Sequence, residues 1–264
     1  MKKGLKLAVS GKGGVGKTTI ASIICQLLQQ EGKRVLAVDA DPDANLGMAL
    51  GFPADVLANA VTIAQDRKLI KEKTGAEPGS SGQWFMLNPT VDDIPQRYVV
   101  EYKGIQLLQM GAVASGGGGC ACPESTLLKA LLNHLIVAEQ DAVIVDMEAG
   151  LEHLGRGTAE SVDGLLIVME PGMRSFTTAK SIIKLAKDLG VTNIFGIVNK
   201  MDSTTLAEIQ QKVGDELLLV GGLPYSDQAV KCDFAGVNLF DACPNIVADV
   251  AKLLERVRSE LSNS

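Results

Sequence analysis

A glycine-rich segment near the amino terminus places the strongest constraint on the fold. Residues 11–18 read GKGGVGKT and directly follow the apolar run Leu5–Val9. This is the G-x-x-x-x-G-K-[ST] pattern of a phosphate-binding loop that joins a strand to a helix. Glycines allow consecutive backbone N–H groups to converge on an anion where a Cβ would block the approach. The pattern predicts a nucleotide-phosphate site at the start of the helix, against the alternative of a glycine-rich turn that binds nothing.

Two residues at the end of this segment have specific expected roles. Lys17 is expected to reach the β- and γ-phosphates, and Thr18 is expected to ligate Mg²⁺. The positive end of the helix that begins here favours the anion. The residues of this segment expected to contact the nucleotide are Gly11, Gly13, Gly14, Val15, Gly16, Lys17, Thr18 and Thr19.

A second lysine, Lys12, lies among the glycines of the phosphate loop. A simple phosphate loop needs only Lys17, so the alternative for Lys12 is a solvated side chain on an exposed loop. The segment KGGVGKT resembles the deviant Walker A family of P-loop ATPases, which includes the Min-type cell-division ATPases. In that family the extra lysine reaches across a two-fold axis to the partner subunit's nucleotide. The resemblance therefore implies a homodimer that forms when ATP binds.

Composition and charge restrict the partners and the compartment. A formal net charge of −6 argues against nonspecific binding to nucleic acid or to anionic membranes. No apolar run reaches the roughly 18–20 residues that span a bilayer, and the first residues lead at once into an expected strand, so no signal sequence is expected. Five cysteines are an odd number, which does not indicate a disulfide framework. We therefore expect a cytoplasmic protein with neither a nucleic acid nor a membrane as its partner.

Apolar runs and amphipathic segments alternate along the chain with one period. The expected strands are Leu5–Val9, Arg34–Asp39, Trp84–Leu87, Ile105–Met110, Ala142–Asp146, Gly164–Met169, Ile194–Asn199 and Leu217–Val220. The expected helices cover residues 17–31, 56–73, 123–139, 175–189 and 246–261. This alternation predicts an α/β fold with a single doubly wound, mostly parallel sheet flanked by helices. We expect residues 1–264 to form a single P-loop NTPase domain.

The second expected strand ends in the acidic sequence DADPD, residues 39–43. Phosphoryl transfer needs a carboxylate for the water shell of the metal and a group that positions the attacking water. In the resembled family the first aspartate of this D-x-D pair serves Mg²⁺ indirectly and the second orients water. By position these are Asp39 and Asp41, so the expected catalytic set is Lys12, Lys17 and Asp41. The alternative for these aspartates is a helix-capping loop.

The run VIVDMEAG at residues 143–150 ends another buried strand in an aspartate. This arrangement can hold Asp146 near Mg²⁺ while the Gly150 N–H lies near the γ-phosphate. A segment held in this way can change conformation when the γ-phosphate leaves. The alternative is an ordinary strand end with a capping aspartate.

The sequence leaves the nucleotide base open. Residues 199–202 read NKMD and satisfy the N-K-x-D pattern of GTPases, in which the aspartate binds guanine. In the deviant Walker A family an asparagine at this strand end contacts adenine, together with backbone of a later loop near Pro224. Lys12 favours ATP, and Asp202 can instead begin the following helix. The expected contacts in this part of the site are Asn199, Lys200 and Pro224.

A C-x-C segment follows four consecutive glycines. Cys120 and Cys122 point the same way in an extended chain, and Pro123 fits the first turn of a helix whose positive end favours thiolates. Two thiolates are half of a tetrahedral set, and a two-fold axis would supply the other half. Such a site suits Zn²⁺, Ni²⁺, Cu⁺ or an iron–sulfur cluster, whereas the alternative is two incidental cysteines. We expect the other three cysteines to be structural: Cys25, Cys232 and Cys243.

Together these segments resemble the CooC-type accessory ATPases of carbon monoxide dehydrogenase. The resemblance rests on residues 11–18, on residues 39–43, on the C-x-C segment and on DMEAGLEHLGRGT at residues 146–158. It implies an ATP-driven homodimer whose paired C-x-C segments hold one Ni²⁺ or Zn²⁺ ion at the interface. It also implies help in nickel insertion into carbon monoxide dehydrogenase or acetyl-CoA synthase.

Two other functions stay open. One is a GTP-dependent nickel chaperone, although such proteins lack a lysine at the position of Lys12. The other is an iron–sulfur cluster scaffold or carrier ATPase, which predicts a brown, iron-containing protein where the nickel hypothesis predicts a colourless one. His153 beside the Asp146 segment is expected to hydrogen-bond and not to ligate a metal.

Overall fold

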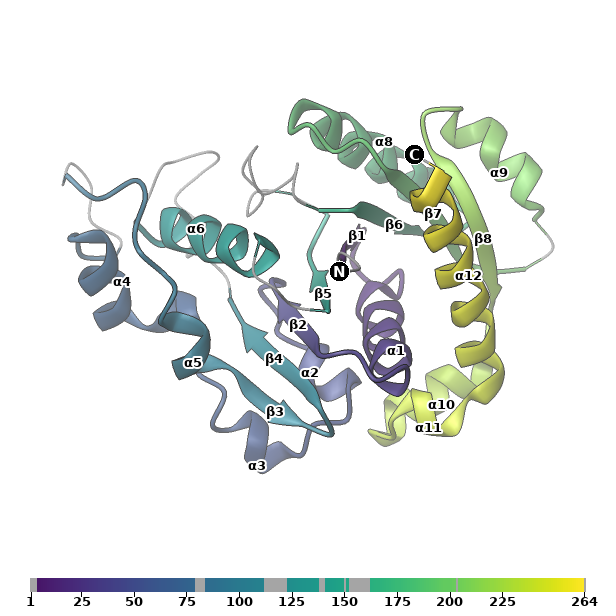
Figure 1. Ribbon diagram of the computed structural model, residues 1–264. Helices are drawn as coiled ribbons and strands as arrows, with labels where there is room; N and C mark the ends of the chain where they lie inside the picture. The colour runs from purple at the N-terminus through teal and green to yellow at the C-terminus, as the bar shows by residue number, and fades with distance from the viewer. Residues whose placement is uncertain are drawn as a thin grey trace.

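The computed structural model describes residues 4–78, 84–111, 123–137, 141–149, 151, 162–202 and 204–263. Eight strands form one sheet in the order β3-β4-β2-β5-β1-β6-β7-β8 (Figure 1). The strands are β1 (Leu5–Gly11), β2 (Val35–Asp39), β3 (Val100–Tyr102), β4 (Ile105–Gln109), β5 (Ala142–Asp146), β6 (Gly164–Met169), β7 (Ile194–Met201) and β8 (Leu218–Pro224). Every pairing is parallel except that of β3 with β4. The predicted mostly parallel sheet is confirmed.

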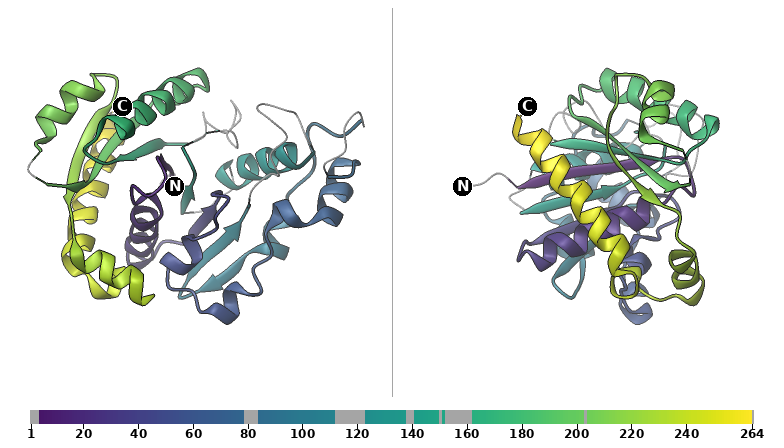
Figure 2. Two further views of the ribbon diagram at one scale, coloured as in Figure 1. Left: turned by 180° about the vertical axis from the view of Figure 1, so that it is seen from behind. Right: turned by 90° about the vertical axis from the view of Figure 1, so that its right-hand side faces the viewer.

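Helices cover both faces of the sheet (Figures 1 and 2). They are α1 (Lys17–Gln30), α2 (Leu46–Ala49), α3 (Ala54–Leu57), α4 (Arg67–Thr74), α5 (Ile94–Tyr98), α6 (Pro123–Val137), α8 (Met173–Asp188), α9 (Leu206–Val213), α10 (Asp227–Ala235), α11 (Leu239–Ala242) and α12 (Pro244–Asn263). Alternate residues of a strand point to opposite faces, so the strands feed two apolar cores. One core packs against α4, α6, α8 and α9, and the other packs against α1 and α12.

The central strands explain why this sheet needs helices on both sides. Every residue of β5 and of β6 is buried, and both strands are almost wholly apolar. Strands that are apolar on both faces are typical of parallel sheets covered by helices. In the part of the chain that the structure describes, no helix is both long and apolar enough to cross a membrane.

Two predictions between residues 54 and 103 are wrong. The helix expected over residues 56–73 is broken into α3, a 3₁₀ turn at Ile63–Gln65 and α4. Asp66 begins α4 by accepting a hydrogen bond from the Leu69 N–H at 2.9 Å, which fixes a helix start inside the expected helix. Residues 84–87 form no strand. The Met86 N–H donates to the Thr74 carbonyl at the end of α4, so this segment follows a helix end and joins no sheet.

Candidate nucleotide-binding site

The phosphate loop leaves β1 at its carboxyl end and enters α1 at Lys17. Gly11 closes β1 and pairs with Val168 of β6. Gly14 and Gly16 have φ angles of 81° and 94°, the left-handed region that favours glycine. A Cβ on Gly16 would also stand 2.3 Å from the Asn199 Nδ2 atom, which would have to move away from the Val15 carbonyl to which it donates. The glycine pattern thus corresponds to a real backbone requirement.

The tip of the loop is open to solvent. Lys12, Gly13 and Gly14 are exposed, whereas the Val15 side chain is buried in the core beneath. The Val15 N–H makes only a long bond of 3.4 Å to the Lys12 carbonyl, which leaves it able to meet an incoming acceptor. An exposed Lys12 agrees both with a role toward a partner subunit and with a solvated side chain, so its role stays a prediction.

Lys17 is the buried cation of the site. Only 6% of the residue is exposed, and its Nζ lies 3.8 Å from the Asp41 Oδ2 atom. A buried ammonium is costly without a counter-charge, which Asp41 provides here. Thr18 and Thr19 follow in the first turn of α1, half-buried, and the Thr19 carbonyl accepts from the Ser22 hydroxyl at 2.9 Å. The lysine and the aspartate that the sequence assigned to catalysis are therefore brought together.

Two further aspartates lie side by side at adjacent strand ends. Asp39 of β2 and Asp146 of β5 are register partners in the sheet, and both are completely buried. Asp39 accepts hydrogen bonds from the backbone N–H groups of Leu46 and Asp41, at 2.9 and 3.3 Å. Burial raises the pKa of Asp39 to about 6 in spite of these bonds, which favour the charged form.

Asp146 is a buried carboxylate with few partners. Neither of its oxygens accepts a hydrogen bond of good geometry within the described residues, although the Thr18 hydroxyl lies close enough to act on its pKa. Burial is the main cause that raises the pKa of Asp146 to about 7. The charge of Asp39 acts in the same direction, and the Thr18 hydroxyl and the Lys17 ammonium act against it. A buried carboxylate with so few partners points to a ligand that supplies more.

The aspartate set fits Mg²⁺. Mg²⁺ is bound in proteins through one or two carboxylates, with water and substrate phosphate completing its shell. Asp146, Asp39 and the Thr18 hydroxyl are oxygen donors of this kind near one edge of the sheet. In the described ranges, this site included, no group of three or more His, Cys, Asp or Glu side chains could hold a metal by itself.

Asn199 and Lys200, expected near the base, contact the phosphate loop. The Asn199 Nδ2 donates to the Val15 carbonyl at 2.9 Å, and the Lys200 Nζ donates to the Gly14 carbonyl at 2.7 Å. Asp202, the last residue of the GTPase-like pattern, accepts from the Thr204 N–H and hydroxyl, both at 3.0 Å. All three side chains therefore have partners in the protein, and their contact with a base stays a prediction.

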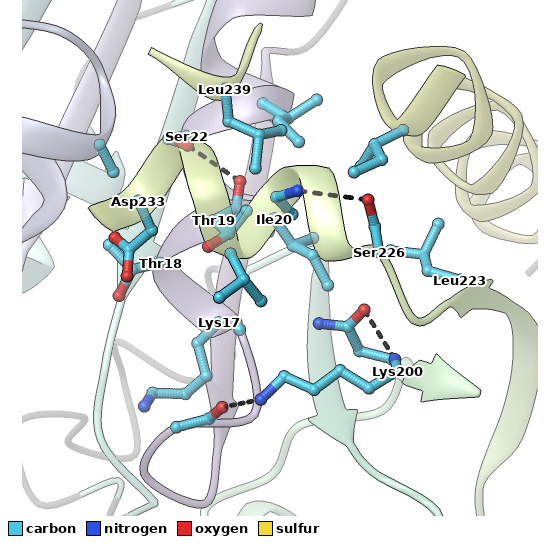
Figure 3. Close-up of a pocket in the computed structure, with 18 of the residues that line it drawn as sticks. Lys17, Thr18, Thr19, Ile20, Ser22, Lys200, Leu223, Ser226, Asp233 and Leu239 are labelled. Carbon is cyan, nitrogen blue, oxygen red and sulfur yellow. Dashed lines mark hydrogen bonds between the residues drawn. The ribbon is translucent and has the colours of Figure 1, made fainter. Parts of the chain in front are cut away.

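A cavity of about 570 Å³ opens beside the loop (Figure 3). This volume lies in the range of small-ligand pockets. The cavity lies between the start of α1, the ends of β7 and β8, and α10. Pro224 is among its lining residues. Asp233 and Leu239 from α10 and α11 also line it, and no sequence motif pointed to them.

The expected metal ligands Cys120 and Cys122 lie outside the described residues, as do Gly150 and His153. The other three cysteines are free and buried, as a structural role requires: Cys25, Cys232 and Cys243. The Sγ atoms of Cys232 and Cys243 lie 3.7 Å apart. This pair is a second group of soft donors that any metal measurement has to separate from the C-x-C segment.

Comparison with known proteins agrees with this geometry. Residues 6–239 match the CobQ/CobB/MinD/ParA nucleotide binding domain. The chain is 46% identical over 257 residues to the carbon monoxide dehydrogenase accessory protein CooC of Rhodospirillum rubrum, covering 96% of this chain and 97% of that protein. It is 42% identical over 257 residues to an uncharacterised ATP-binding protein of Methanocaldococcus jannaschii, covering 96% of each.

Solved structures agree on the fold. A ParA family ATPase of Chlorobium tepidum superposes with a TM-score of 0.68 at 20% identity, covering 96% of this chain and 98% of that one. The MinD cell division protein of Aquifex aeolicus superposes with a TM-score of 0.66 at 21% identity, covering 98% of each chain. With its phosphate loop, its strand-end aspartates and its near full-length match to CooC, this chain belongs to the CobQ/CobB/MinD/ParA nucleotide-binding family and, within it, to the CooC-type proteins.

Proposed function

We propose that this protein is a Mg²⁺-dependent ATPase that works as a homodimer and assists nickel insertion into a metal-centre enzyme. The observation that carries the ATPase part is the buried Lys17–Asp41 pair at the phosphate loop, together with the buried carboxylate of Asp146. The accessory part is supported by the 46% identity to a protein described as an accessory protein of carbon monoxide dehydrogenase. Carbon monoxide dehydrogenase or acetyl-CoA synthase is the proposed client.

The Lys17–Asp41 pair suggests how nucleotide binding prepares hydrolysis. At 3.8 Å the two groups neutralise one another when no phosphate is bound. The β- and γ-phosphates of ATP would give Lys17 a stronger partner, because they carry more charge than one carboxylate. Asp41 would then be released to orient the attacking water. Thr18, Asp146 and Asp39 would hold Mg²⁺, which when bound neutralises charge that develops on the phosphates.

Helix α6 offers a link between the nucleotide and the proposed metal site. It begins at Pro123, directly after Cys122, and its leucines share a core with Met147 and Leu151, which follow Asp146. A movement of the segment after Asp146 on loss of the γ-phosphate would therefore press on the helix that carries the C-x-C segment. In the proposed dimer, Cys120 and Cys122 of two subunits hold one Ni²⁺ or Zn²⁺ ion as cargo.

The proposal favours ATP over GTP. Asp202, which would read guanine in a GTPase, accepts two hydrogen bonds from Thr204 in the turn before α9. A relative that is 42% identical over nearly the whole chain is described as ATP-binding. Lys12 also favours ATP, because it matches the extra lysine of the deviant Walker A ATPases. In those proteins that lysine reaches the partner subunit's nucleotide.

Equilibrium titration with ATP and GTP, followed by phosphate-release assays with and without Mg²⁺, tests the ATPase proposal. Wild type should bind ATP more tightly than GTP and hydrolyse it only with Mg²⁺. Lys17→Ala should lose binding, because no other buried cation of the loop faces the phosphates in the described part of the site. Lys187→Ala, which removes an exposed ion pair with Glu216, is the matched control. Wild type that binds no ATP, or prefers GTP, would contradict the proposal.

A further inference from the structure

Lys200 has an unusual backbone conformation. Its φ is 55°, and only one other non-glycine residue of the described ranges, Lys103, has a positive φ. The pairing of β7 with β8 shifts register at this point, between Val198 and Met201. The Asn199 Oδ1 accepts from the Lys200 N–H at 2.9 Å and supports the bend. Left-handed backbone is unfavourable for lysine, so the surrounding contacts must hold it.

The side chain of Lys200 joins two other strand ends. Its Nζ donates to the Gly14 carbonyl at 2.7 Å and forms an ion pair with Glu170 Oε1 at 2.5 Å (Figure 3 shows the extended lysine). Glu170 directly follows β6, and its own N–H donates to the Ser175 hydroxyl at 3.0 Å. Because β1, β6 and β7 are neighbours in the sheet, one ammonium connects the phosphate loop to both adjacent strand ends.

These contacts fix the direction of backbone N–H groups. In a planar trans peptide the carbonyl and the N–H point in opposite directions. Lys200 holds the Gly14 carbonyl, so it also sets the direction of the Val15 N–H. Asn199 holds the Val15 carbonyl in the same way, which sets the Gly16 N–H. Two residues of β7 thus orient two consecutive N–H groups of the phosphate loop, those of Val15 and Gly16, by binding the carbonyl of the same peptide.

We propose that Glu170 and Lys200 form a latch that keeps the phosphate loop in its anion-binding shape. Both are positioning residues: Lys200 binds the loop, and Glu170 holds Lys200 in place. The inference rests on the proposed ATPase function and adds to it two residues that act through the Gly14–Val15 peptide. The competing role for Lys200 is a direct contact with the γ-phosphate, for which the ammonium would have to leave Gly14.

Affinities for ATP and ADP separate the two roles. Phosphate-loop N–H groups cradle the phosphates that ATP and ADP share. The latch therefore predicts that Lys200→Met weakens ATP and ADP binding by the same factor, about tenfold, with kcat at saturating ATP close to wild type. A direct γ-phosphate contact predicts a loss for ATP alone. Lys200→Arg keeps a donor for both Gly14 and Glu170, so it should bind both nucleotides within about threefold of wild type.

A double-mutant cycle tests Glu170. Glu170→Gln should weaken both nucleotides about threefold, and adding it to Lys200→Met should cause no further loss, because the two residues act as one unit. Lys187→Ala removes a comparable exposed lysine pair and should bind like wild type. Glu170→Gln leaves the bend at Lys200 unaltered, so it tests the latch even when Lys200→Met folds poorly.

Three results would overturn the latch: wild-type affinity of Lys200→Met for ADP, fully additive losses in the double variant, or wild-type affinity of Glu170→Gln for both nucleotides. Failure of the ATPase proposal is distinguishable, because it shows in the wild-type protein itself, which would then bind no ATP or prefer GTP.

Discussion

The buried carboxylate of Asp146 leads to a prediction about stability that needs no ligand. Asp146→Asn should make the nucleotide-free protein more stable at neutral and alkaline pH. The asparagine has the same shape and stays uncharged, whereas Asp146 is completely buried and burial opposes its ionisation. A substitution at a proposed metal-binding residue would thus stabilise the fold while removing the activity.

The size and sign of the effect follow from the pKa. The folded protein holds the pKa of Asp146 at about 7, against an ordinary value of 3.8. Folded protein therefore binds more protons than unfolded protein between about pH 4 and pH 7, and stability falls as pH rises through this window. At pH 8 the ionised Asp146 costs about 4 kcal/mol of folding free energy. In a chain of this size that corresponds to a Tm difference of up to about 10 °C.

Thermal unfolding of the metal-free protein from pH 4.5 to pH 8.5 measures this effect. The Tm of Asp146→Asn should exceed that of wild type at pH 8, and the two should converge toward pH 4.5. Asp215→Asn, an exposed aspartate, should follow wild type at every pH. A Tm of Asp146→Asn below that of wild type at pH 8, or a difference that does not change with pH, would refute the reasoning.

Two further substitutions separate hydrolysis from assembly. Asp41→Asn should bind ATP nearly as wild type does but hydrolyse it about tenfold more slowly or worse, because the lost carboxylate positions water and contacts no phosphate. Phosphate release at the wild-type rate would show that Asp41 is not catalytic. Lys12→Ala should bind ATP as a monomer, because the lost cation is the one expected to contact the partner subunit's nucleotide. Sedimentation with a nonhydrolysable analogue should therefore show no dimer. Normal dimerisation would leave Lys12 as an ordinary surface lysine.

The central fold was predictable because its signals are local. Buried parallel strands such as β5 and β6 are uninterrupted apolar runs, and acidic residues at strand ends are visible in the sequence. The hairpin of β3 and β4 was missed because its turn uses Lys103 and Gly104, with φ angles of 48° and 77°. Such turns usually begin with asparagine or aspartate, so lysine gave no signal.

The parts of the site that depend on strand order were not predictable. Glu170 meets Lys200 only because β6 and β7 are adjacent, and no motif contains both residues. The wall of the cavity made by α10 and α11 likewise depends on tertiary packing, since α11 contacts α1 and α12. By contrast, the neighbourhood of Lys17 and Asp41 followed from two strand-end motifs, since the carboxyl ends of parallel strands meet at one edge.

The shared metal site is the claim on which the accessory function depends, and native mass spectrometry of the protein loaded with Ni²⁺ or Zn²⁺ tests it directly. We expect one ion per dimer, and we expect Cys120→Ser and Cys122→Ser each to lose the ion, because a hydroxyl is a poor ligand for these metals. Cys232→Ser, which breaks the buried thiol pair, should keep both the ion and the dimer. One ion per monomer, or an ion that survives in Cys120→Ser and is lost in Cys232→Ser, would contradict the account.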